Sequence, residues 1–168
     1  MKHYNVEGYV RHKHDLEKVL ERNEDNIDYD DFGNVNYTNM TDKAIITMWM
    51  PLCEALARKF ATSQQASGVM SIRDLISDGY EGLIKAVSKI DRTMLAESED
   101  TEKTIKSFLS KRIRGAIRRQ IDKNRGDMRI PEHKYNEIRK NFGKDKKMVA
   151  MFFNSVFLSI DAKSEDDM

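Results

Sequence analysis

The segment between residues 105 and 124 constrains the fold of this 168-residue chain more than any other segment. Its apolar residues recur every three or four positions, which is the spacing of one buried face of an α-helix. The residues expected on this face are Phe108, Leu109, Ile113, Ala116, Ile117 and Ile121. The segment therefore predicts a long amphipathic helix.

Helical spacing also predicts helices over residues 6–22, 43–62, 71–91 and 132–142. The chain has only two prolines, and no internal repeat or β-hairpin signal is found. We expect an all-α fold, a compact helical bundle with flexible N- and C-terminal extensions. Residues 23–42, rich in Asn, Asp and Gly, are expected to form a loop or linker, and residues 93–104 an acidic loop. Pro51 should kink its helix or mark a fresh start.

The segment after residue 70 carries an apolar stripe interrupted by glycine. Gly79 and Gly82 each cost about 1 kcal/mol relative to alanine inside a helix, so close packing against a neighbour is expected there. The stripe is formed by Ile72, Leu75, Ile76, Leu83, Ile84 and Val87.

Composition excludes several classes of protein. Cys53 is the only cysteine, so no disulfide framework is expected and the chain is predicted to work in the cytoplasm. No apolar run is long enough to span a bilayer, and the N-terminus lacks the apolar core of a signal peptide. No phosphate-binding glycine loop or nucleophile motif is present. We therefore expect no enzyme activity, no cofactor and no small-molecule substrate. The histidines are too scattered to predict a metal site: His3, His12, His14 and His133.

The net charge of +1 conceals opposed blocks of charge. Residues 106–147 hold 15 Lys or Arg against 5 Asp or Glu, whereas residues 148–168 carry a net charge of −3 and residues 1–105 a net charge of −6. Within the basic block, Lys111, Arg114, Arg118 and Arg125 share one helical stripe, and Arg112, Arg119 and Lys123 share another. Such stripes suit the phosphates and the major groove of duplex DNA, although a solvated helix face has the same pattern.

Two segments carry a family resemblance. They are DLISDGYEGLIKAVSKID, from Asp74 to Asp91, and IRGAIRRQIDKNRGDMRIPEH, from Ile113 to His133. In this order they resemble the second conserved region of the sigma-70 family of bacterial transcription initiation factors. MPLCEALARKFA, which precedes them, resembles the core helix that comes before this region in the family. The resemblance covers roughly residues 45–140.

The second segment resembles the helix with which sigma factors recognise and help to melt the promoter −10 element. The family carries two tryptophans where this chain has Lys111 and Arg112, and a base-reading glutamine where it has Gly115. Phe108 falls at the family's aromatic that stacks against the flipped adenine. The resemblance implies these DNA-binding residues: Phe108, Lys111, Arg112, Arg114, Gly115, Arg118, Arg119, Lys123, Arg125, Arg129 and His133.

The first segment resembles the helix by which sigma factors grip the coiled-coil helices of the largest subunit of RNA polymerase. Its pattern alone also fits an ordinary core helix with solvated acids. The resemblance implies these polymerase-binding residues: Asp74, Ser77, Asp78, Tyr80, Glu81 and Ile84.

Three regions are predicted along the chain. They are an N-terminal helix and linker (1–42), a helical domain of the sigma region 2 type (43–142) and an apolar segment with an acidic tail (143–168). No room remains for the family's −35-reading module, as in short phage late-transcription sigma factors. The tail resembles either the linker that enters the polymerase cleft or the tails that bind a sliding clamp or co-activator. A plain segment that completes the core is the third alternative.

We therefore expect a sigma-like initiation factor that binds core RNA polymerase and promoter DNA but no membrane. Two alternatives stay open. One is a polymerase-binding regulator or sigma competitor without promoter specificity, and the other is a structural helical protein with a solvated basic face.

Overall fold

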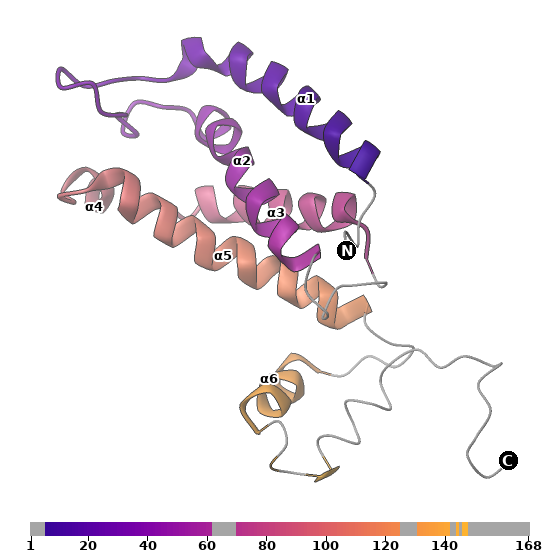
Figure 1. The fold of residues 1–168 in the computed structure, drawn as a ribbon. Coiled ribbons are helices and arrows are strands. Elements are labelled where there is room, and N and C mark those ends of the chain that lie inside the picture. The colour runs from indigo at the N-terminus through magenta and orange to yellow at the C-terminus, as the bar shows by residue number, and fades with distance from the viewer. Residues whose placement is uncertain (1–5, 62–69, 125–130, 142–143, 145, 148–168) are drawn as a thin grey trace, which may run out of the picture. The chain divides into compact units, whose positions relative to one another are not determined.

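A computed structural model of the chain describes residues 6–61, 70–124, 131–141, 144 and 146–147 (Figure 1). Helices dominate these residues, and the prediction of an all-α fold is confirmed. The predicted C-terminal segment after residue 147 lies outside the described residues. The elements are α1 (Val6–Asn23), a 3-10 turn (Glu24–Asn26), α2 (Asp42–Ala61), α3 (Ile72–Val87), α4 (Arg92–Ala96), α5 (Thr101–Asn124) and α6 (Glu132–Asn141).

The chain divides into two units, Met1–Arg118 and Arg119–Met168, with the division inside α5. In the first unit, α2 packs against α3, and α1 packs against both (Figure 1). A buried Tyr9–Glu54 hydrogen bond ties α1 to α2, and Arg58 Nη1 donates to the Tyr9 hydroxyl over 3.3 Å. The N-terminal helix is therefore part of the folded unit.

The central helix α2 begins with Thr41, whose hydroxyl accepts a hydrogen bond from the Ala44 amide at 3.2 Å. The helix then runs without interruption through Pro51, so the predicted alternative of a fresh start there is wrong. Cys53 lies at its centre and is fully buried. Burial raises the pKa of this thiol to about 12, which makes it a packing residue rather than a reactive one.

Gly82 of α3 allows α5 to approach closely, so the predicted close packing is confirmed at this glycine but not at Gly79. A Cβ atom added at Gly82 would lie 2.6 Å from the Cβ atom of Ala116, far inside van der Waals contact. One added at Gly79 would meet Cys53 Cβ at 3.4 Å, which is an ordinary contact. Four of the six residues predicted for the buried face of α5 are buried, namely Leu109, Ile113, Ile117 and Ile121. Phe108 and Ala116 are only half-buried, and Ile105, which was not placed on this face, is buried.

Residues 93–104 do not form the single acidic loop that was predicted. Asp91 caps a short helix, α4, by accepting hydrogen bonds from the amides of Thr93 and Met94. Asp100 accepts one from the Lys103 amide, so α5 already begins at Thr101. Asp100, one of the acids that suggested a loop, and Asp91, just before that segment, each cap a helix, because a short carboxylate satisfies the free amides of a first helical turn.

One further prediction needs correction. Ile84 was placed on the apolar stripe of α3, but it is 52% exposed. Between the ends of α1 and α2, the predicted loop contains a 3-10 turn and an antiparallel bridge between Tyr29 and Val35, so it has ordered structure. Tyr37 and Met40, both buried, fix its later half to the unit.

In the second unit, α6 follows Pro131, whose carbonyl oxygen accepts from the amides of Lys134 and Tyr135. Tyr135 and Ile138 are its buried residues. Arg139 of α6 forms an ion pair with Asp122, whose side chain is almost fully buried. This pairing compensates a carboxylate that would otherwise be costly to bury.

Candidate functional site on helices α3 and α5

Four cations of the first unit form what we call the cationic face of α5, namely Lys111, Arg112, Arg114 and Arg118. All four are exposed, whereas Ile113 and Ile117 on the same helix are buried. None of the four cations pairs with a carboxylate among the described residues. A row of uncompensated cations on a rigid helix is suited to bind phosphates.

The remaining predicted DNA-binding residues have different settings. Gly115 is half-buried, and helical geometry places it between the two stripes of cations. Arg119, Lys123 and His133, which belong to the second unit, are exposed. Arg125 and Arg129 lie outside the described residues.

Phe108 combines with Arg112 one helical turn later. The guanidinium carbon of Arg112 lies 4.4 Å from the centroid of the Phe108 ring, a cation–π arrangement. Arg112 therefore lies over an aromatic ring of its own chain. A planar cation above an aromatic ring provides a surface on which a nucleobase can stack.

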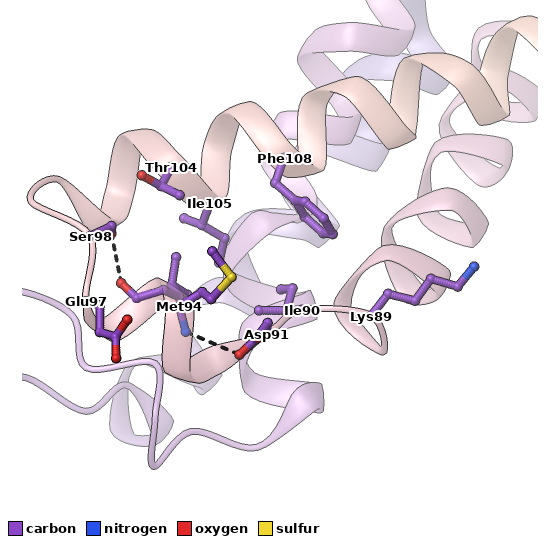
Figure 2. Close-up of a pocket in the computed structure, with 10 residues that line it drawn as sticks. Lys89, Ile90, Asp91, Met94, Glu97, Ser98, Thr104, Ile105 and Phe108 are labelled. Carbon is purple, nitrogen blue, oxygen red and sulfur yellow. Dashed lines mark hydrogen bonds between the residues drawn. The ribbon is translucent and has the colours of Figure 1, made fainter.

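A pocket of about 540 Å³ opens beside Phe108 (Figure 2). Figure 2 shows Phe108 and Ile105 on α5 facing Met94 of α4 and Ile90 of the preceding turn. Its volume is within the usual range for ligand pockets. Sequence reasoning missed Met94 and Leu95, because residues 93–104 were expected to form a loop without a buried side. It also missed Ile90, which lies in the predicted helix 71–91 but was not placed on its apolar stripe. The apolar spacing of Ile90, Met94 and Leu95 was the signal that could have found them.

The exposed side of α3 carries the residues predicted to bind polymerase. Asp74, Ser77, Glu81 and Ile84 are exposed and fall on successive turns. Asp74 also forms a capping box with Ser71, and Glu81 pairs with Lys85. We call Asp74, Ser77, Asp78, Glu81 and Ile84 the acidic face of α3. Carboxylates around an exposed isoleucine suit a partner that offers both cations and apolar surface.

Asp78 is the most buried carboxylate of the acidic face. Its side chain is half-buried, and its Oδ2 atom is buried without a hydrogen-bond partner among the described residues. Burial, together with the neighbouring Asp74 and Glu81, raises the pKa of Asp78 above its ordinary value of 3.8. A carboxylate in such a position reduces stability, which is common where function rather than folding selects the residue.

The Asp78→Asn variant should therefore be more stable than the natural chain at pH 7. Because its pKa is raised, Asp78 supports folding only when protonated, and this support is lost as the pH rises through the raised pKa. Asparagine avoids that loss, so the thermal unfolding midpoint of the variant should exceed that of the natural chain at pH 7. The two midpoints should be equal near about pH 3, where Asp78 is protonated. Asp15→Asn, at an exposed carboxylate of α1, should shift neither midpoint. An equal midpoint for Asp78→Asn and the natural chain at pH 7 would contradict the raised pKa.

Tyr80 lies apart from the other predicted polymerase-binding residues. Its hydroxyl is 2.9 Å from Nε2 of His12 on α1, and their rings are 5.9 Å apart. Burial raises the pKa of Tyr80, and its side chain is only partly exposed. His12 is thus a packing partner of Tyr80. The structure assigns Tyr80 a contact with α1, and its role in binding a partner stays a prediction.

The described residues contain no helix with the length and apolar character needed to cross a bilayer. They also contain no group of three or more His, Cys, Asp or Glu side chains placed to hold a metal ion. Comparison with known proteins finds no family model that matches the sequence and no curated protein that matches it significantly.

Proposed function

We propose that this chain is a sigma-like transcription initiation factor, which binds core RNA polymerase and directs it to recognise and melt promoter −10-type DNA. The observation that carries the proposal is the cationic face of α5 beside the Phe108 pocket. It brings together the exposed cations of α5, the contact between Arg112 and Phe108, and an apolar pocket that α5 lines together with α4. Melted DNA offers phosphates and unstacked bases together, so it is the ligand that uses all three.

The acidic face of α3 supports the second half of the proposal. It lies on a different helix from the cationic face, so the two can bind different partners simultaneously. Its charge is opposite to that of the cationic face, which makes it unsuitable for DNA and suitable for a basic protein surface. The resemblance of this segment to the polymerase-gripping helix of sigma factors names that partner as the coiled coil of the largest subunit.

Ile84→Lys and Glu81→Lys should each weaken binding to core RNA polymerase by about tenfold or more, because each places a cation against a basic partner. Both positions are exposed, so the fold should tolerate the changes. Binding can be measured with labelled chain and purified core enzyme. Val10→Lys and Glu21→Lys on α1 are the matched controls, because Val10 is 59% exposed and Glu21 is an exposed acid.

Unchanged affinity of both α3 variants would remove α3 as the polymerase-binding helix. Equal losses in the α1 controls would indicate a general charge effect rather than a defined face. Tyr80 is avoided as a test position, because its contact with His12 would mix binding with folding.

A second function is favoured by the departures from the family pattern. Lys111 and Arg112 replace the two tryptophans, and Gly115 replaces the base-reading glutamine. A polymerase-binding regulator or sigma competitor without promoter specificity would need only non-specific phosphate binding. Reconstitution of core enzyme with this chain on phage and host templates separates the two functions. An initiator gives defined transcript starts, whereas a competitor gives none and reduces transcription by a resident sigma factor.

A further inference from the structure

An exposed aromatic side chain stands at the tip of a small acidic hairpin, residues 28–36. Phe32 is 90% exposed, the most exposed of the large apolar side chains in the described residues. Tyr29, in the bridge that closes the hairpin, is 57% exposed. An isolated exposed apolar residue is unremarkable, but two aromatic rings on one protruding element are typical of a protein-binding site.

The hairpin is held in a defined conformation by Asp30. Its Oδ1 atom accepts hydrogen bonds from the amides of Phe32 and Asn34 at 2.9 and 2.8 Å. The backbone closes the turn with Asp30 N to Asn34 O at 2.8 Å and Gly33 N to Asp30 O at 3.0 Å. Gly33 has φ +81°, a conformation that glycine adopts without strain. Phe32 is therefore presented on a preorganised turn, which lowers the entropic cost of binding.

The base of the hairpin is anchored to the helical unit. Arg92 of α4 donates to the carbonyl oxygens of Thr38 and Met40 and pairs with Asp42. Tyr37 is buried next to this junction in the sequence. Figure 1 shows the hairpin projecting beyond α1 and α2 at the end of the unit where α4 lies. A partner can therefore reach the tip without displacing a helix.

Charge indicates what kind of partner fits. The hairpin, residues 28–36, contains three Asp and no Glu, Lys or Arg. This negative field opposes nucleic acid and anionic lipid. It favours a protein surface on which lysine and arginine side chains surround an apolar pocket.

We propose that the acidic hairpin is a second docking element for core RNA polymerase, with Phe32 seated in an apolar pocket ringed by basic side chains. The inference rests on the proposed function and adds a contact separate from the acidic face of α3. Two anchors on one rigid unit fix its orientation on the enzyme, because either anchor alone leaves rotation about its contact.

The test uses the full chain and purified core RNA polymerase. Phe32→Ala should weaken binding by about tenfold or more, the loss typical of a central aromatic anchor. Asp31→Lys should weaken binding to core RNA polymerase more at low salt than at high salt, because the effect of this charge reversal is electrostatic. Val10→Ala, which truncates an apolar residue 59% exposed on α1, and Glu21→Lys are the matched controls.

The outcomes separate this inference from the proposed function. If Phe32→Ala binds core enzyme as tightly as the natural chain while Ile84→Lys does not, the hairpin proposal is overturned and the α3 interface stands. A natural chain that fails to bind core enzyme would overturn both. Sedimentation of the chain alone tests whether the hairpin mediates self-association instead. A dimer that Phe32→Ala abolishes would assign the hairpin to self-association and overturn the polymerase contact.

Discussion

The double variant Arg114→Ala, Arg118→Ala should lose promoter opening while keeping its affinity for core RNA polymerase. Both guanidinium groups are exposed on the cationic face of α5 and lie one helical turn apart. A hydrogen bond to a charged group contributes about 1.5–3 kcal/mol, so losing two corresponds to roughly a hundredfold or greater decrease in open complexes. Permanganate footprinting of thymines in the melted region measures this loss directly.

The matched control for this experiment lies on α1. Arg11 and Arg22 are also exposed arginines on a helix of the same unit, so Arg11→Ala, Arg22→Ala removes the same charge. It should leave the footprint unchanged. The conservative pair Arg114→Lys, Arg118→Lys should retain phosphate attraction but lose the planar fork, giving an intermediate footprint. A full footprint from the alanine pair would show that α5 does not open DNA.

The variant Gly82→Ala should be strongly destabilised, although alanine is the better helix former. The added methyl group would lie 2.6 Å from Ala116 Cβ, so α3 and α5 must separate. Overpacking of this kind costs about 1–3 kcal/mol, which lowers the unfolding midpoint by roughly 3–10 °C. Thermal denaturation followed by circular dichroism measures the change.

Two companion variants show whether the contact itself is responsible. Gly79→Ala introduces its methyl group at 3.4 Å from Cys53 Cβ, so the gain in helix propensity should make it neutral or stabilising. Ala116→Gly should restore space for the Gly82→Ala methyl, so the double variant should recover part of the lost stability. Independent, additive effects of Gly82→Ala and Ala116→Gly would argue against the close approach of the two helices.

Much of the fold was predictable because the strongest signals were periodic. The buried residues of α5 recur at helical spacing, and Ile113 and Ile117 are buried where that spacing placed them. The close approach at Gly82 was also predictable, because glycine inside a helix is costly unless something requires it. Both inferences use the local pattern of one helix.

The errors arose where the position of a residue depends on a distant element. Ile84 continues the apolar stripe of α3, but it is half-exposed at the edge of the packed surface. His12 is hydrogen-bonded to Tyr80, 68 positions away, and nothing in its own neighbourhood signals that contact. Residues 93–104 resemble a solvated loop until Asp91, just before them, and Asp100, within them, are seen to cap helices.

The candidate site was predictable by residue type but not by arrangement. The exposed cations of α5 were expected from charge and spacing, and the structure places them opposite the buried face. The Phe108 pocket was not expected, since it requires α4 to fold back beside α5. A pocket formed by three separate elements has no signature in any one of them.

The missing side chain at Gly82 has a mechanical consequence for the proposed function. Because the backbones of α3 and α5 approach so closely there, little sliding or rocking can occur between them. An enzyme bound to α3 would then hold the arginines of α5 at a fixed distance and angle. Strand separation would then begin at a fixed distance from the polymerase. The absence of a side chain at Gly82 would help to set this distance.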